Sequence, residues 1–100
     1  MQKEILELRN LIKNRNIDKA YEQAKRLNKI NKNNKEIIKI LAFLFIQRNQ
    51  FDSTIKILNE YYEDKPLEKD FDYYVNMGTS YKALEEYKKS LDMYQQARAI

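Results

Sequence analysis

The sequence predicts an all-α protein built from three helical hairpins, which together make six antiparallel helices. Two observations support this fold class. Apolar residues recur at helical spacing in six separate stretches, and the 100 residues include a single glycine and a single proline. An all-β fold would need many more turn residues. Because a chain of this length makes one domain, we treat residues 1–100 as a single domain.

The first hairpin consists of two amphipathic stretches separated by the polar residues "NRN" at positions 14–16. The apolar positions of the first stretch are Ile5, Leu8, Leu11 and Ile12, and those of the second are Ile17, Tyr21, Ala24 and Leu27. Their spacing places each set on one face of a helix. We therefore expect the two helices to bury these faces against each other.

The same layout follows twice more. Residues 37–46 precede "RNQ" and a stretch with Phe51, Ile55, Leu58 and Tyr62, and residues 74–84 precede "EE" and a stretch with Tyr87, Leu91 and Tyr94. The units span about residues 1–34, 35–69 and 70–100, with Leu11, Phe45 and Tyr81 aligned at steps of 34 and 36. Helix pairs at this period are typical of solenoids, in which each pair stacks on its neighbours.

The third unit, "YYVNMGTSYKALEEYKKSLDMYQQARAI", resembles a tetratricopeptide repeat (TPR). The matching positions are Tyr74, Met77-Gly78, Tyr81, Tyr87, Ser90, Tyr94 and Ala97, and the second unit matches through Ile38, Leu41-Ala42, Phe45, Phe51, Thr54, Leu58 and Pro66. We expect Gly78 and Ser90 to be small where two helices cross closely. The first unit departs from the pattern at Glu4, Glu7 and Leu8, as an N-terminal capping repeat would. The resemblance implies a right-handed TPR-type superhelical solenoid.

The stretch "KILAFLFIQRN" contains seven apolar residues in a row. On a helix, one arc carries Ile37, Ile38, Leu41, Ala42, Leu44 and Phe45, which we predict to form core, and the other carries Glu36, Lys39, Ile40, Phe43, Ile46 and Gln47. The TPR resemblance implies that the second arc lines a concave groove that binds peptides. The alternative is a central helix that is apolar nearly all round in a narrow, self-packed stack.

The resemblance implies a partner-binding groove with contributions from all three units. Its residues are Ile5, Arg9, Ile12 and Lys13, then Glu36, Lys39, Ile40, Phe43, Ile46 and Gln47, then Asp72, Val75, Asn76, Thr79 and Lys82. An apolar centre with basic and amide edges suits a peptide or amphipathic helix of another protein, with apolar anchors and acidic character. We expect Phe43 and Ile40 to be the anchors, with Arg9 and Lys39 setting orientation.

One TPR specialisation does not extend to this chain. TPR co-chaperones that hold a C-terminal carboxylate do so with Lys, Asn and Arg side chains. The corresponding positions here are Ile5, Arg9, Ile40, Asp72 and Asn76. The clamp is essentially absent, and Asp72 would repel a carboxylate.

Catalysis has little support in the sequence. There is no Cys and no His, which removes thiolate chemistry, the usual zinc ligands and the commonest general base. Asp70 is well placed as a helix N-cap, and Glu85-Glu86 lies at the turn that opens the last helix. We therefore expect a non-catalytic protein–protein interaction module, a scaffold or adaptor, with no metal or cofactor.

Nucleic-acid binding is a less favoured alternative. Residues 1–50 carry 12 Lys and Arg against 5 acidic residues, whereas residues 51–100 carry 7 against 10. The basic first half could bind phosphates. Its lysines are spread around the helices, however, instead of forming a stripe with interleaved aromatics. The apolar run is too short to span a membrane, and the N-terminus does not resemble a signal peptide, so we expect a cytoplasmic protein.

The third unit ends without the polar helix that usually covers a final TPR hairpin. Leu91, Tyr94, Ala97 and Ile100 are expected to leave an open apolar edge. We expect the chain to be the N-terminal part of a longer protein, with self-association through this hairpin as the alternative. In longer proteins that resemble this one, such an array often precedes a transferase domain. Substrate recruitment for a larger enzyme is therefore the alternative function.

Overall fold

The computed structural model describes all 100 residues and consists of six α-helices without strands. The helices are α1 (Gln2–Lys13), α2 (Ile17–Ile30), α3 (Lys35–Gln47), α4 (Phe51–Tyr62), α5 (Phe71–Ala83) and α6 (Tyr87–Arg98). A short 3₁₀ turn, η1 (Pro66–Glu68), lies between α4 and α5. The predicted all-α class and the number of helices are confirmed. None of the helices is both long enough and apolar enough to cross a membrane.

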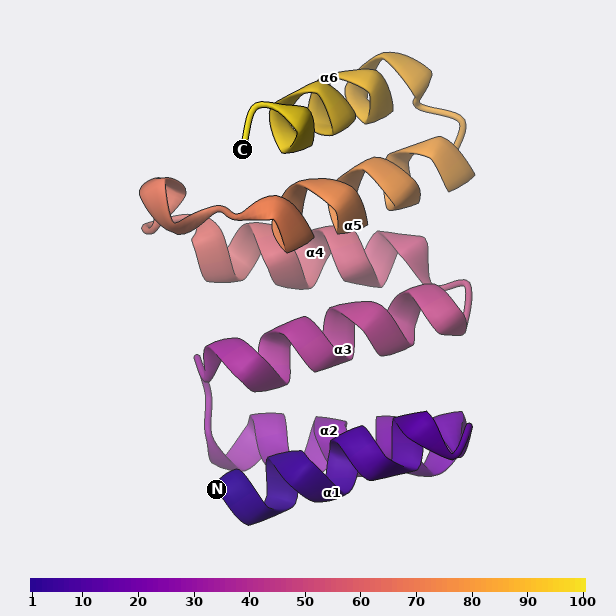
Figure 1. Ribbon diagram of the computed structural model, residues 1–100, viewed down its shortest axis with the longest axis vertical. Helices are drawn as coiled ribbons and strands as arrows, with labels where there is room; N and C mark the ends of the chain where they lie inside the picture. Colours follow the sequence, from indigo (N-terminus) through magenta and orange to yellow (C-terminus); the bar gives the residue numbers. More distant parts are fainter.

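The helices are stacked along the longest axis of a molecule that measures 37 × 26 × 21 Å. Figure 1 shows α1 and α2 at one end, α6 at the other, and successive helices running in opposite directions. Each helix packs on the next one in the chain, and α3 also contacts α5. The core therefore extends along the stack.

The turn inside each helix pair has the same backbone geometry in all three pairs. One residue in each turn has a positive φ, and these residues are Arg15 (62°), Asn49 (60°) and Glu85 (62°). The N–H of the next residue donates to a carbonyl five residues earlier, which belongs to Leu11 (2.8 Å), Phe45 (2.8 Å) and Tyr81 (2.9 Å). This is the hydrogen bond of a Schellman motif. Leu11, Phe45 and Tyr81, which the repeat period aligns in the sequence, thus occupy equivalent positions in three equivalent turns.

Side-chain caps begin the two helices that follow longer connections. The Asn34 side chain accepts a hydrogen bond from the N–H of Ile37 (3.2 Å) at the start of α3. The Asp70 carboxylate accepts one from the N–H of Tyr73 (3.0 Å) at the start of α5, as the sequence predicted. Helices α2, α4 and α6 begin directly from the tight turns and have no side-chain cap.

Two apolar clusters form the core, and α3 contributes to both. The first cluster consists of Ile5, Leu8, Ala20, Tyr21, Ala24, Leu27, Ile37, Ile40, Leu41 and Leu44. The second consists of Ile38, Ala42, Leu58, Tyr61, Tyr62, Tyr73 and Met77. Helix α3 is apolar nearly all round because it has packed neighbours on both sides. Ile40, predicted to lie on the groove face, is only 6% exposed and packs in the first cluster, although its edge lines a surface hollow.

Small residues lie where α5 and α6 cross. A Cβ atom added to Gly78 would lie 2.7 Å from Cε1 of Tyr94, inside van der Waals contact. The Ser90 hydroxyl donates to the carbonyl of Gly78 (2.8 Å), and Thr54 makes a longer equivalent bond to Ala42 (3.4 Å) in the preceding pair. The expected close approach at Gly78 and Ser90 is therefore present. Ala97, expected at an open edge, is instead buried.

Candidate functional site

A hollow of about 570 Å³ lies across α1, α3 and α5. Its lining residues are Arg9, Ile12, Lys13, Glu36, Lys39, Ile40, Phe43 and Asp72. All eight belong to the groove set that the sequence predicted. Their convergence requires α1, α3 and α5 to lie side by side, as the first helices of the three pairs do in Figure 1. We refer to this hollow as the α1–α3–α5 groove.

Two of the predicted groove residues, Ile5 and Ile40, are buried in the core, and of these two Ile40 alone lines the hollow. Ile5 is 3% exposed and packs in the first apolar cluster. Ile5 and Leu8, about one turn apart, are the two buried residues of α1 and hold this helix on its neighbours. Ile40 contributes only an edge to the groove. Neither side chain has enough free surface to be an anchor for a ligand.

Phe43 is the large apolar side chain that the groove exposes, with 39% of its surface free. Ile12 beside it is half-buried and packs on the first cluster. Together with the edge of Ile40, these residues give the groove an apolar floor. The remaining lining residues are charged and form its rim. An apolar floor inside a polar rim is the usual arrangement of a binding site.

The other predicted groove residues lie outside this hollow. Gln47 and Lys82 are exposed, whereas Ile46, Val75, Asn76 and Thr79 are half-buried. The Thr79 hydroxyl lies 3.2 Å from the hydroxyl of Tyr94, so it already has a partner within the protein. The structure therefore concentrates the candidate site on α1 and α3, with Asp72 as the contribution of α5.

Ion pairs across the groove join neighbouring helices. The guanidinium of Arg9 lies 3.3 Å from the Glu36 carboxylate, which links α1 to α3. The Lys39 ammonium lies 2.6 Å from the Asp70 carboxylate and 3.4 Å from that of Asp72, which links α3 to α5. Both cations expected to orient a ligand are thus paired internally. Lys13 lines the groove and forms no ion pair.

The Lys39–Asp70 pair also shifts the protonation equilibria of its members. The hydrogen bond to Asp70 raises the pKa of Lys39, and partial burial opposes this only in part. Partial burial alone would raise the pKa of Asp70. The Lys39 ammonium and the N–H of Tyr73 outweigh that effect, so the pKa of Asp70 lies below its ordinary value. Both groups are therefore held in their charged forms.

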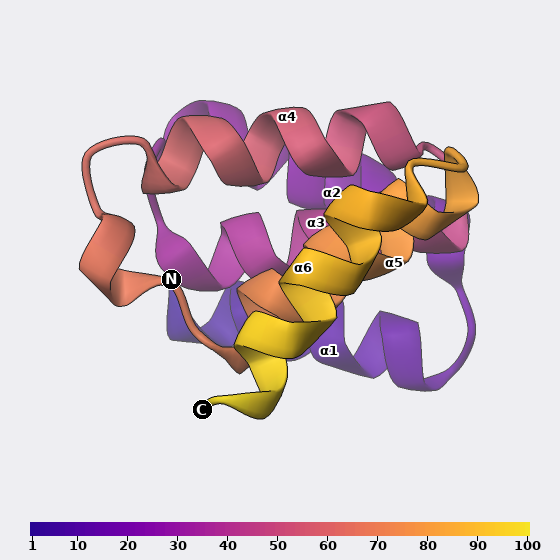
Figure 2. The ribbon, with the colours of Figure 1, turned by 90° about the horizontal axis from the view of Figure 1, so that it is seen from above.

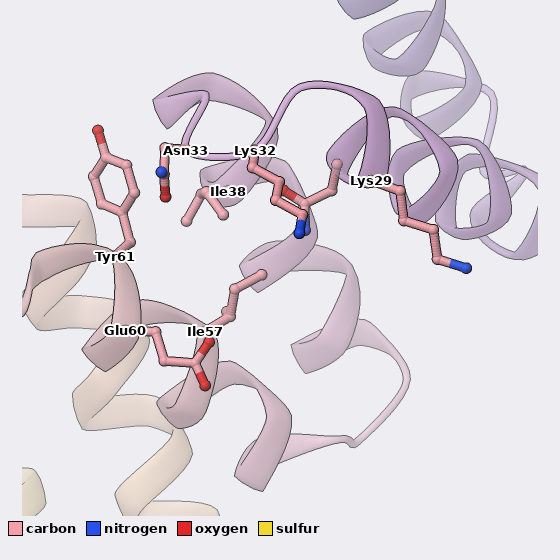
Figure 3. Close-up of a pocket in the computed structure, with 8 residues that line it drawn as sticks. Lys29, Lys32, Asn33, Ile38, Ile57, Glu60 and Tyr61 are labelled. Carbon is pink, nitrogen blue, oxygen red and sulfur yellow. The ribbon is translucent and has the colours of Figure 1, made fainter.

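A second hollow, of about 330 Å³, lies where the end of α2 meets α3 and α4 (Figure 3). It is lined by Asn28, Lys29, Lys32, Asn33, Ile38, Ile57, Glu60 and Tyr61. None of these residues belongs to the predicted groove set, although Lys29 and Lys32 belong to the basic first half. The Glu60 carboxylate lies among these side chains and would oppose a phosphate. This hollow gives little support to a nucleic-acid site.

Two of the three aromatic residues in the basic half, Tyr21 and Phe45, pack within the protein instead of offering free faces for bases. The rings of Tyr21 and Phe45 meet edge to face at 5.7 Å, and the guanidinium of Arg48 lies 4.0 Å from the centre of the Tyr21 ring. The most exposed aromatic side chains, Phe71 and Tyr87, lie in the acidic second half. Phe43 is the aromatic ring that the basic half leaves partly free, and the carboxylates of Glu36 and Asp72 line the same hollow, which disfavours binding of single strands there.

No protein-family model matches this chain, and no curated protein matches it either. The TPR resemblance therefore rests on the motif residues and the repeated turns, and it stays a proposal.

Proposed function

We propose that the protein is a TPR-like helical solenoid that acts as a non-catalytic interaction module. Its α1–α3–α5 groove would receive a peptide or amphipathic helix from another protein. Support comes from the three equivalent turns and from the eight predicted groove residues that line one hollow. The observation that carries the proposal is the exposed Phe43 ring on the floor of a charged hollow, because an apolar group that a fold leaves uncovered is a candidate contact.

The internal ion pairs change the kind of ligand we propose. Since Arg9 and Lys39 are already paired, the groove has less free positive charge than its composition suggests. The ligand would place an apolar side chain against Phe43 and Ile12. Polar groups of the ligand would contact the paired charges of the rim, and an acidic group would meet Lys13. Because these rim pairs fix the groove in advance, little ordering on the protein's side would oppose binding.

The test is capture of partners from a lysate of the source cells after nuclease treatment, with three proteins as bait. These are the parent chain, Phe43→Asp and a matched control, Leu67→Asp, which changes a fully exposed apolar residue outside the groove. Circular dichroism establishes that all three fold alike. We expect a polypeptide that the parent and the Leu67 variant retain and the Phe43 variant loses. Equal retention by all three proteins contradicts the groove as the working site.

A further inference from the structure

The two ends of the stack differ in the side chains that they leave exposed. Helix α1 exposes mainly polar and charged side chains, with Leu6 as an exception. At the other end, the exposed large apolar residues are Phe71, Leu84, Tyr87, Leu91 and Ile100. Figure 2 views the molecule from this end and shows no other element in front of α6. Met1 and Ile30 are also exposed at the α1–α2 end, but the exposed large apolar residues are more numerous at the α6 end.

Comparison of α6 with α4, its equivalent in the preceding helix pair, shows which contacts the face of α6 lacks. In the second cluster, Tyr73 and Met77 of α5 pack on α3 and α4, with Ile55 of α4 beside them. Leu91 and Tyr94 of α6 lie 36 residues after Ile55 and Leu58 and are their equivalents. On α6 this face borders an empty hollow of about 380 Å³, lined by Phe71, Val75, Leu91, Tyr94, Gln95, Ala97 and Arg98. The surface that α5 covers on α4 is uncovered on α6.

The first helix of another copy cannot fill this hollow as α5 fills its predecessor. The positions of α1 that correspond to Tyr73 and Met77 are Lys3 and Glu7, both exposed and charged. Inserting them between α5 and α6 would bury charges without partners, which costs free energy. Head-to-tail stacking into a filament is therefore disfavoured. The apolar end can instead pair with the apolar end of a second copy, which closes the assembly at two chains.

The charges along α6 suit an antiparallel arrangement of two copies of that helix. Glu85 and Glu86 precede the helix, and Arg98 is its last residue. Glu86 pairs with Lys89 (3.4 Å), whereas Glu85 and Arg98 form no ion pair within the monomer. In the sequence, the point midway between Glu85 and Arg98 falls between Leu91 and Asp92. Around a two-fold axis at that midpoint, each Glu85 faces the other chain's Arg98.

We propose that the protein forms a two-fold symmetric dimer in which α6 packs antiparallel on α6 of a second copy, with Leu91 at the centre. Tyr87 and Leu91, both more than half exposed in the monomer, are covered in this dimer. Glu85 and Arg98 form reciprocal ion pairs at its two edges. The apolar contact consists of few side chains, so we expect a weak dimer that dissociates at about micromolar concentrations.

Sedimentation equilibrium of the full chain over a range of concentrations tests the dimer. As concentration rises, the measured mass of the parent should increase from 12.2 kDa, the mass of the monomer, to twice that value and no higher. Leu91→Glu should weaken association by at least about tenfold, because it buries an unpaired charge at the centre. The matched control is Leu6→Glu, which alters an equally exposed leucine on α1 and should leave association unchanged. Circular dichroism checks that both variants fold.

A charge exchange tests the orientation of the helices. Glu85→Arg and Arg98→Glu should each weaken the dimer, and the double variant should restore it. The backbone at position 85 accepts arginine, since Arg15 has the same positive φ in the first turn. A parent that stays monomeric at all concentrations, assemblies larger than a dimer, or a Leu91 variant that associates like the parent would each overturn the proposal. Phe43→Asp should dimerise normally, so failure of the groove proposal and failure of this one are distinguishable.

Discussion

Gly78 shows how a single absent side chain sets the distance between two helices. The Tyr94 ring occupies the space that a Cβ atom at position 78 would need, with its nearest atom at 2.7 Å. Alanine would favour the helical backbone by about 1 kcal/mol, but overpacking of this contact costs about 1–3 kcal/mol. We therefore expect Gly78→Ala to lower the free energy of unfolding by about 1 kcal/mol in urea titrations.

The sign of that effect should depend on Tyr94. In a Tyr94→Ala background the obstructing ring is gone, and the same glycine-to-alanine change should raise the free energy of unfolding by about 1 kcal/mol through helix propensity. The double-mutant cycle measures this reversal directly. A destabilisation of equal size in both backgrounds would mean that the ring is not the obstacle and that the explanation given for Gly78 is wrong.

Glu85 has a positive φ of 62°, a backbone conformation that disfavours side chains with a Cβ atom. Glycine is the usual residue at this place in a Schellman turn. Glu85→Gly should therefore raise the free energy of unfolding by about 1 kcal/mol, measured by urea denaturation. Asn49→Gly is the matched control at the equivalent turn, and its gain should be smaller because asparagine tolerates this conformation. Equal gains at both positions would contradict the strain assigned to Glu85.

At the level of elements, the connection between α3 and α5 should be sensitive to acid. The pKa of Asp70 is depressed in the folded protein, so its contribution to stability is present above the unfolded value, about 4, and is lost as pH falls through the folded value. Because the Asp70 side chain is about a third exposed, we expect this contribution to be about 0.5–1 kcal/mol. Asp70→Asn retains an N-cap oxygen but should abolish this part of the acid dependence.

Urea titrations at pH 6 and pH 3 measure this difference. The parent should lose more free energy of unfolding between the two pH values than Asp70→Asn does. Asp72→Asn is the matched control, since Asp72 contacts the same lysine at 3.4 Å with a more exposed side chain. This variant retains the Lys39–Asp70 pair, so it should still show the acid dependence assigned to Asp70. Identical acid profiles for the parent and the Asp70 variant would show that the Lys39–Asp70 pair does not stabilise the fold.

The sequence predicted the helices more completely than it predicted the candidate site. The six helices were predictable because helical periodicity is local, and the turns because the polar residues between the stretches recur. Alignment of the three units grouped fifteen residues into a groove, and eight of them line one hollow. Ile40 and Phe43 share one arc of α3, yet Ile40 is buried and Phe43 exposed. That distinction depends on how close α1 lies to each side chain, and the helical positions of the α3 residues alone do not give this distance.

The ion pairs were not predictable for a related reason. Arg9 and Glu36 are 27 residues apart, and Lys39 and Asp70 are 31 apart. Neither separation equals the repeat step, so aligning the units does not bring these residues together. Their contacts depend on the offset between neighbouring helices and on side-chain conformation. The second hollow was not predictable for the same reason, because it forms between the end of α2 and a face of α4.

For the whole molecule, the two apolar clusters matter because α3 belongs to both. Loss of packing in one cluster weakens the helix that supports the other, so we infer that the chain unfolds as one cooperative unit. Four tyrosines extend the second cluster across the α4–α5 connection. The rings of Tyr61, Tyr62, Tyr73 and Tyr74 meet edge to face in sequence, with centres 4.9, 4.9 and 5.0 Å apart. Such contacts stabilise beyond the area that they bury.

This aromatic series should make the molecule sensitive to alkali. Burial, reinforced by the nearby Asp70 charge, raises the pKa of Tyr62 to about 12, from 10.0. The neutral phenol is therefore favoured by folding, and its contribution is complete below pH about 10 and lost as pH rises towards 12. Lys39 acts in the same direction, because its pKa is also raised. We expect Tyr62 alone to remove about 2 kcal/mol from the free energy of unfolding across this range.

Urea titrations at pH 8 and pH 11 test this expectation with Tyr62→Phe, which keeps the ring and removes the ionisable hydroxyl. The variant should lose less free energy of unfolding between these pH values than the parent, because the unfolded phenylalanine has no proton to release. Tyr87→Phe is the matched control at concentrations where the chain is monomeric, since Tyr87 is then largely exposed. This variant retains Tyr62, so it should still show the alkaline loss assigned to Tyr62. If Tyr62→Phe is as alkali-sensitive as the parent, the buried phenol is not the group that limits stability at high pH.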